Sequence, residues 1–143
     1  MDTTDREILR LLAGDARMTV SKLSSKLRVA RSTVQTRLER LENSGAIAGY
    51  TIRLGTELSK GRIRATVLLT VEPRAQPAVL ARLKAIGAVE IVHTASGRFD
   101  MILQVATQST AELDAVLDQI GDIQGIKSSE SLIHLSTRID RAI

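Results

Sequence analysis

Cysteine is absent from the 143-residue chain, and aromatic side chains are almost absent, because Tyr50 and Phe99 are the only two. The lack of cysteine excludes a disulfide framework, a thiolate nucleophile and any cysteine-based zinc or iron–sulfur site. No apolar run approaches the ~18 residues that a transmembrane helix needs, and the charged opening segment MDTTDREILR lacks the pattern of a signal peptide. We therefore expect a cytoplasmic protein with no membrane partner. Its 43% of hydrophobic residues suffice for one large or two small globular domains.

The positive charge of the chain is concentrated in its first half. Residues 1–64 carry 13 Lys and Arg against 7 Asp and Glu, a formal charge of +6, whereas residues 65–143 carry 7 against 9, a formal charge of −2. Such an asymmetry points to an anionic partner of the first half, nucleic acid before membrane, although a solvated basic face gives the same pattern. Proteins that read single strands usually stack bases on several aromatic side chains. The scarcity of aromatics therefore favours a duplex.

Three short helices are predicted in the first 45 residues, each from a start signal followed by an apolar face. Thr4 and Glu7 have the spacing of a capping box, and Thr19 can cap a second helix. Apolar residues at i, i+4 and i+7 predict a third helix over residues 31–44. Helices this short are stable only when they pack together, so we expect one small helical domain.

From residue 46 onward the pattern changes to strands that alternate with two helices. We expect extended pieces at 46–54 and from 62 onward, strands at 89–95, 99–106 and 131–139, and helices between Pro73 and Gly87 and from Ser109 to Gly121. The order strand, helix, strand, strand, helix, strand predicts a four-stranded antiparallel sheet with both helices on one face. The fold class is thus α+β, with domains at 1–48 and 62–143 joined by a linker at 49–61.

The other face of this sheet is expected to carry enough apolar side chains to bind a partner. The alternation of the predicted strands assigns these side chains to it: Leu68, Val92, Ile102, Ile133 and Leu135. We therefore expect a dimer or a larger assembly that forms through the sheet.

The three N-terminal helices have the layout of a helix-turn-helix, whose last helix enters the major groove of duplex DNA. At about 100° per residue, the side of the third helix away from its apolar stripe is short and polar near the N-terminus. We expect base contacts from Ser32, Thr33, Gln35 and Thr36, with Arg40 on the same outward side, and phosphate contacts from Lys22, Lys26, Arg28, Arg31 and Arg37. Ala30 is a poor cap, so either Ser32 caps a shorter helix or the helix start is weakly held.

Two stretches carry a resemblance to a known family. The run LRVARSTVQTRLERLENSGAIAGYT, preceded by DREILRLLAGDARMTVSKLS, resembles the winged helix-turn-helix of the Lrp/AsnC transcription regulators, and SGRFDMIL at residues 96–103 resembles a loop motif of their βαββαβ ligand-sensing domain. The resemblance implies a homodimer formed through the sheets, often assembled into tetramers or octamers. It also implies that a small effector, usually an amino acid, binds between dimers.

The resemblance also implies an effector site. Gly97, Phe99 and Asp100 match the family's loop motif, and Ser96 and Arg98 lie in the same loop. Phe99 stands where tyrosine is frequent in the family, so a hydroxyl that could fix a polar ligand is missing. A purely structural interpretation is that Gly97 is a hairpin glycine and Phe99 a core residue.

An enzyme is the main competing interpretation, because βαββαβ folds host many chemistries. His93 and His134 are the only histidines, and the sequence has no glycine-rich phosphate loop, nucleophile elbow or metal-ligand spacing. Asp114, Asp118 and Asp122 recur on one helix face, which is more typical of an exposed stripe than of a cation site. We therefore expect no catalytic residue, no metal and no cofactor. The sequence is also compatible with a DNA-binding regulator that has no effector response, and with a module whose helices contact protein.

Overall fold

The computed structural model describes residues 1–141. The final residues of the expected second domain, 142–143, lie outside the described residues. The chain forms two compact units: Met1–Arg53 with the tail from Ile139 on, and Leu54–Arg138. None of the described helices has the length and apolar content needed to cross a membrane.

Three helices form the first unit: α1 (Thr3–Gly14), α2 (Val20–Leu27) and α3 (Arg31–Asn43). Their apolar faces meet in a small core made of Ile8, Leu12, Leu23, Val34 and Leu41. The three predicted helices are confirmed, and each buries the face that its apolar spacing indicated.

The start of α1 differs from the sequence-based expectation. Asp2 is the N-cap and forms a capping box with Asp5, with Asp5 N–H donating to Asp2 Oδ1 at 3.0 Å. The capping box predicted at Thr4 and Glu7 is therefore wrong, because an earlier carboxylate already holds the first amides and Glu7 pairs with Arg10 instead. Such a cap is worth ~1 kcal/mol.

The other two helix starts follow the sequence more closely. Thr19 caps α2 as predicted, since its hydroxyl accepts the N–H of Lys22 at 3.1 Å. Ala30 is the N-cap of α3 and makes no side-chain capping bond. The structure therefore has the longer form of α3 with an uncapped start, rather than a shorter helix capped by Ser32.

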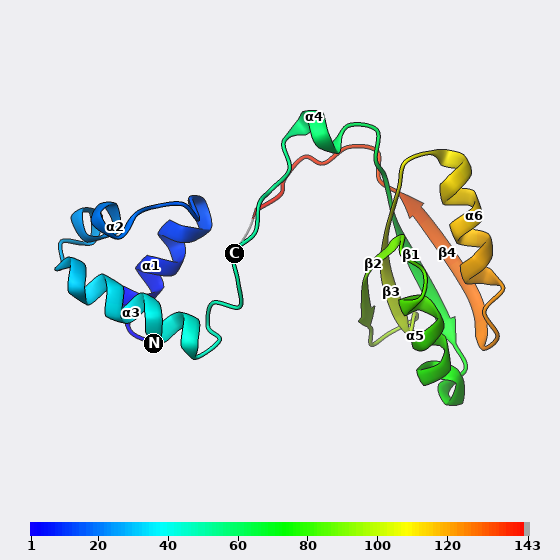
Figure 1. The fold of residues 1–143 in the computed structure, drawn as a ribbon. Helices are drawn as coiled ribbons and strands as arrows, with labels where there is room; N and C mark the ends of the chain where they lie inside the picture. The colour runs from blue at the N-terminus through cyan, green and yellow to red at the C-terminus, as the bar shows by residue number, and fades with distance from the viewer. Residues whose placement is uncertain (142–143) are drawn as a thin grey trace. The chain divides into compact units, whose positions relative to one another are not determined.

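The second unit is built on a four-stranded antiparallel sheet in the order β2-β3-β1-β4 (Figure 1). The strands are β1 (Ile63–Val71), β2 (Val89–Thr94), β3 (Met101–Thr107) and β4 (Ile126–Ile133). Between them lie a 3₁₀ turn (Pro73–Ala75), α5 (Gln76–Lys84) and α6 (Thr110–Gly121), and a single helical turn, α4 (Thr56–Ser59), precedes β1. The predicted βαββαβ arrangement and α+β class are confirmed.

One face of the sheet makes the core of this unit. Every second residue of β1, from Ala65 to Val71, is buried. These side chains pack with Val79 and Leu83 of α5 and with the apolar side of α6, which includes Leu113. Both helices therefore cover the same face, as the sequence pattern predicted.

Two element boundaries were wrong. The last strand spans 126–133 rather than 131–139, because it pairs along β1 from Val71↔Ile126 to Ala65↔Ile133. Its sequence IKSSESLI hides this, since an exposed edge strand does not need alternating apolar residues. The expected extended piece at 46–54 forms no strand.

The face opposite the helices carries a different set of residues from the one predicted. Leu68 pairs with Ile102 there, and both are half-buried. Val92 does not belong to this face, because it pairs with buried Leu103 and packs against the core. An irregularity in the register between Val89 and Ile91 reverses the alternation, so Ile91, 46% exposed, takes the outward position.

The two C-terminal members of that predicted set also differ from expectation. Ile133 pairs with buried Ala65 and so lies on the helix side of the sheet. Leu135 follows the end of β4 and is 96% exposed. The face opposite the helices, called the open face below, therefore includes Ile91, Leu68, Ile102 and Leu132.

Candidate nucleic-acid interface and effector loop

A tight turn joins α2 to α3. Arg28 ends α2 in the left-handed conformation with φ of 56°, which costs energy for any residue other than glycine. The Ser24 hydroxyl donates to the carbonyl of Val29 and holds the turn closed. Leu23 of α2 and Val34 of α3 are fully buried in the same core. The two helices are therefore fixed against each other, while Arg31 and Ser32 at the start of α3 stay exposed.

The polar side of α3 is exposed as the helical geometry predicted. Ser32, Gln35 and Thr36 are exposed, and Thr33 is half-buried. The Gln35 amide donates to Glu39 at 3.0 Å, one helical turn further on. These four predicted base-reading residues lie together on one side of α3, with side chains short enough to let the helix approach a groove closely.

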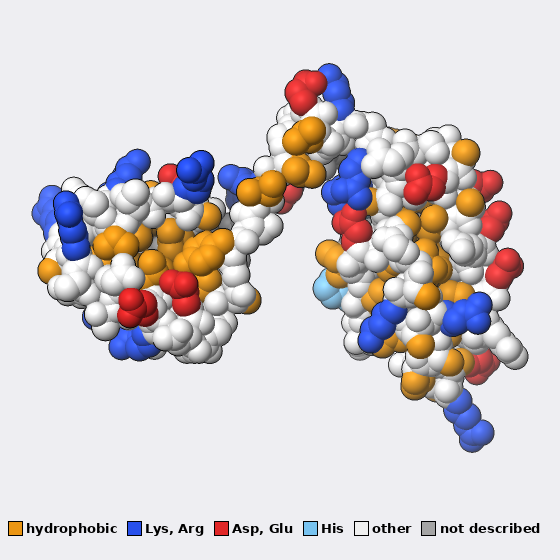
Figure 2. Space-filling view, viewed as in Figure 1, with side chains coloured by type: hydrophobic (Ala, Val, Ile, Leu, Met, Phe, Trp, Pro, Cys, Tyr) orange, Lys and Arg blue, Asp and Glu red, His pale blue; other side chains and the backbone are white. Residues whose placement is uncertain are grey.

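Four predicted phosphate-binding cations surround this helix start. Lys22, Lys26, Arg28 and Arg31 are all exposed. Within residues 1–141 none of the four forms an ion pair with a carboxylate. Figure 2 shows Lys and Arg side chains over α2 and the turn that follows it. Their charges are therefore available to an anionic partner.

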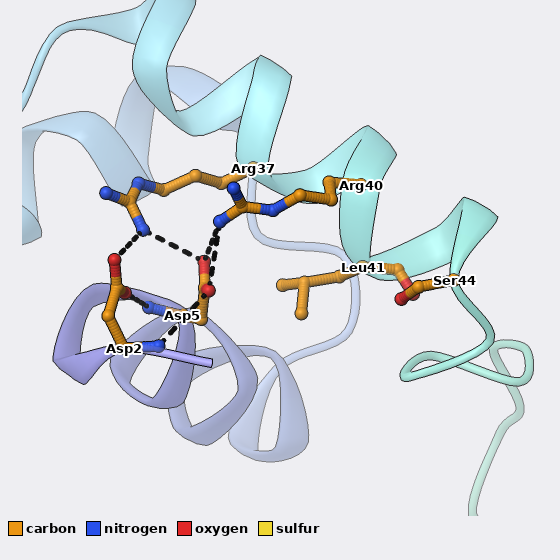
Figure 3. Close-up of polar contacts among 6 residues, drawn as sticks. All are labelled: Asp2, Asp5, Arg37, Arg40, Leu41 and Ser44. Carbon is orange, nitrogen blue, oxygen red and sulfur yellow. Dashed lines mark hydrogen bonds and ion pairs between the residues drawn. The ribbon is translucent and has the colours of Figure 1, made fainter.

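The other two predicted DNA-binding cations, Arg37 and Arg40, are held by Asp5 of α1 and by its N-cap Asp2 (Figure 3). Arg37 donates to Asp2 and, at 3.1 Å, to Asp5. Arg40 donates through one nitrogen to the two carboxylate oxygens of Asp5, at 3.1 and 3.4 Å. We call these four residues the aspartate–arginine cluster. It links the start of α1 to the middle of α3.

The electrostatics of the cluster favour the charged forms. The hydrogen bond from Arg37 lowers the pKa of Asp2 to about 2. For Asp5, burial raises the pKa, but hydrogen bonds from Arg37 and from the Asp2 N–H outweigh it and the net pKa is lowered. The hydrogen bond to Asp2 raises the pKa of Arg37. At neutral pH the cluster therefore consists of two carboxylates facing two guanidinium groups.

Sequence reasoning missed Asp2 and Asp5. A signal for Asp5 was present, because it precedes Ile8 and Leu12 by three and seven residues and so lies on the apolar stripe of α1. A carboxylate on a buried stripe needs a cationic partner. Arg37 and Arg40 of α3 are the cationic partners of Asp5.

The predicted effector loop joins β2 to β3. Ser96, Gly97 and Arg98 are exposed, and Gly97 has φ of +130°, a conformation that side-chain-bearing residues rarely adopt. The Arg98 guanidinium lies 5.0 Å from the centre of the half-buried Phe99 ring and pairs with Glu130 of β4 at 3.7 Å. The exposed part of the predicted loop thus consists of Ser96, Gly97 and Arg98, whereas Phe99 is half-buried.

Asp100 fastens this loop to β1. Its N–H donates to the carbonyl of Leu69 and its Oδ2 accepts the N–H of Val71, both at 2.8 Å. Its carbonyl accepts the N–H of Ala95 at 2.9 Å. One carboxylate oxygen is thus already used by the backbone, a contact that the sequence did not indicate.

Comparison with known proteins places the chain in a family. A model described as the Lrp/AsnC ligand binding domain matches residues 64–143, and one described as winged helix-turn-helix DNA-binding matches residues 1–48. The chain belongs to the Lrp/AsnC family. The resemblance noted in the sequence is thereby confirmed.

Relatives of this Lrp/AsnC chain include named transcriptional regulators and solved structures with the same fold. The transcriptional regulator LrpA of Mycobacterium tuberculosis is 31% identical over 134 residues, covering 93% of this chain and 89% of LrpA. The structure of AsnC from E. coli has a TM-score of 0.90 at 27% identity and covers 100% of this chain and 97% of AsnC. A regulator from Neisseria meningitidis, solved as a complex with L-Met, has the same fold, with a TM-score of 0.89 at 23% identity, covering 99% of this chain and 94% of the regulator.

The family sets the broad function. Lrp/AsnC proteins with this pair of domains are transcriptional regulators that bind DNA through the helix-turn-helix and carry a ligand-binding domain. The relatives are regulators rather than enzymes, which agrees with the expectation drawn from the sequence.

Proposed function

We propose that this regulator binds duplex DNA in a sequence-specific way and that a small effector, an amino acid as first candidate, changes its DNA affinity or its assembly. The observation that carries the DNA half is the exposed start of α3, flanked by four cations that are free of carboxylate partners within residues 1–141. A helix start with short polar side chains fits the major groove, and unpaired cations beside it fit the flanking phosphates.

The residues divide into two roles. Ser32, Thr33, Gln35 and Thr36 contact base edges, which carry sequence information. Lys22, Lys26, Arg28 and Arg31 contact phosphates, which set affinity and position. Arg37 and Arg40 act through the aspartate–arginine cluster.

The proposed organisation has a DNA-binding domain at 1–48, a linker at 49–61 and an effector-binding and assembly domain at 62–143. Two copies associate through the open face of the sheet, where Leu68, Ile91, Ile102 and Leu132 would lose their contact with water. Dimers assemble further into tetramers or octamers, and the protein works in the cytoplasm. Each assembly presents several DNA-binding domains to one operator.

The effector is proposed to bind at Ser96, Gly97, Arg98, Phe99 and Asp100. The ligand-binding family of residues 64–143 supports this proposal, and L-Met in the Neisseria meningitidis regulator supports an amino acid. The loop is exposed in a single copy, so a second copy is needed to enclose a ligand there. An effector then shifts affinity only by as much as it prefers one assembly over another.

The DNA half is tested by selecting binding sites from a pool of randomised duplexes. Gln35→Ala and Thr36→Ala should change which sequences are enriched, because they remove base contacts. Lys26→Ala and Arg31→Ala should enrich the same sequences with weaker affinity. Uniform weakening by all four variants would contradict the proposed division of roles.

The effector half is tested by calorimetry against the twenty amino acids, with light scattering on the same samples. We expect at least one amino acid to release or absorb heat and to change the assembly size. Absence of both effects for every amino acid would favour an oligomeric DNA-binding regulator with no effector response.

A further inference from the structure

The two arginines of the aspartate–arginine cluster are held differently. The side chain of Arg37 is only 25% exposed and reaches both Asp2 and Asp5. The side chain of Arg40 is 63% exposed and reaches Asp5 alone, through one terminal nitrogen. Each arginine donates through a single terminal nitrogen, but the Arg37 side chain is mostly buried beside two carboxylates, whereas the Arg40 side chain is mostly exposed beside one (Figure 3).

Arg40 also lies on the side of α3 that is proposed to face DNA. Ser32, Thr36 and Arg40 follow each other at intervals of four residues, which places them in one row along the helix. A guanidinium has five N–H donors in a planar fork. With one nitrogen held by Asp5, the remaining donors are still free for an anion beside that row.

We propose that Asp5 is a positioning residue for DNA binding: it fixes the Arg40 guanidinium so that its free donors meet a backbone phosphate next to the bases read by Ser32 and Thr36. Asp2 and Arg37 in turn hold Asp5, whose side chain is only 3% exposed. This inference rests on the proposed DNA binding and adds two acidic residues to its machinery. A long arginine held in place in the free protein loses less side-chain freedom on binding.

A simple charge argument predicts the opposite effect, which makes the proposal testable. Carboxylates near a DNA-binding surface repel phosphates, so loss of the Asp5 charge should tighten binding if Asp5 has no positioning role. If Asp5 positions Arg40, the same loss weakens binding. The sign of the change therefore decides between the two.

The experiment measures the affinity of the full chain for a selected duplex over a range of salt concentrations. Asp5→Asn should weaken binding roughly three- to tenfold and reduce the slope of log K against log salt by about 1 for each bound copy, the loss of one phosphate contact. Glu7→Gln is the matched control, because it makes the same change in charge on α1 but removes a partner of Arg10 only. It should leave affinity unchanged or slightly tighter.

A double variant and a conservative variant complete the test. In an Arg40→Gln background, Asp5→Asn should have no further effect on DNA affinity, because Asp5 acts through Arg40. If Asp5→Asn does not fold, Arg40→Lys serves instead: it keeps the charge at an exposed site but not the planar fork, and should weaken binding nearly as much as Arg40→Gln.

Tighter binding by Asp5→Asn, or full affinity with Arg40→Lys, would overturn the positioning role. Failure of the underlying function looks different, because the wild-type chain itself would then not bind the duplex, or would bind it without salt dependence.

Discussion

Two aspartates organise the two candidate sites, and they do so with different partners. The Asp5 carboxylate at the α1–α3 contact accepts hydrogen bonds from two guanidinium groups, whereas the Asp100 carboxylate at the β2–β3 loop accepts the backbone N–H of Val71. The first contact depends on the negative charge of the carboxylate. The second depends on an acceptor oxygen in the correct place. The same residue type is thus charge-dependent in one region and geometry-dependent in the other.

The largest effect that separates the two regions is expected from Asp5→Ala. It removes a buried carboxylate that is only 3% exposed, which leaves Arg40 without a carboxylate partner, Arg37 with Asp2 alone and a gap at the α1–α3 contact. We expect the Tm of the N-terminal unit to fall on the order of 10 °C. Thermal unfolding followed by amide exchange in each unit measures this. A loss of stability confined to residues 54–138 would contradict a role of Asp5 in stabilising the N-terminal unit.

Acid should act on the same region less strongly, because a protonated carboxyl still accepts a hydrogen bond. The pKa of Asp2 is lowered from 3.8 to about 2 and that of Asp5 is lowered too. A carboxyl group whose pKa is lower in the folded than in the unfolded state stabilises the fold at pH values above its unfolded-state pKa. This stabilisation is lost as the pH falls through its folded-state pKa. Stability of the N-terminal unit should therefore decline between about pH 4 and pH 2. Circular dichroism across this range measures it, and Asp2→Asn should flatten the decline.

In the loop, Asp100→Ala should destabilise the C-terminal unit by about 1–2 kcal/mol, because the Val71 N–H loses its acceptor. Asp100→Asn keeps an acceptor oxygen and should stay near the wild-type stability. Urea unfolding of both variants gives the comparison. Equal losses in the two variants would show that the charge, and not the acceptor, matters at Asp100.

Asp100→Asn also separates the loop's structure from its proposed ligand. It keeps the hydrogen bond to Val71 but removes the charge that could pair with the ammonium group of an amino acid. Loss of effector heat in calorimetry with retained stability would place Asp100 at the ligand. An unchanged heat of effector binding would show that Asp100 only holds the loop and does not contact the ligand.

The smallest effect is expected from Arg98→Ala. Its ion pair with Glu130 is exposed, with side chains 82% and 51% accessible, and such pairs contribute less than about 1 kcal/mol. Stability should therefore stay within that margin while effector binding falls. A large loss of stability would make Arg98 a structural residue of the loop.

The sequence predicted the helices and the sheet because their apolar spacings are regular. Ala65, Val67, Leu69 and Val71 alternate in β1, and all are buried. It failed where exposure removes the pattern, as in β4, and where one extra residue shifts it, as between Val89 and Ile91 in β2. The spacing of apolar residues does not reveal an exposed edge strand or a register shift, since each depends on pairing with the neighbouring strand.

The candidate sites show the same limit. The exposed row Ser32 and Thr36 on α3 follows from helical geometry alone. The link from Asp5 to Arg40 joins residues 35 positions apart, and the link from Asp100 to Val71 joins residues 29 apart. Such long-range partners are set by how the elements pack. A carboxylate on the apolar stripe of α1 was the one local sign of them.

The central claim, that the cations around the start of α3 bind DNA phosphates, is tested most directly by a salt titration of duplex binding. Fluorescence anisotropy of the full chain with a labelled duplex should give log K falling linearly with log salt, with roughly a thousandfold loss between 50 and 200 mM. Arg31→Ala should lower the slope by about 1 for each bound copy. An affinity that does not change with salt, in both proteins, would contradict the account.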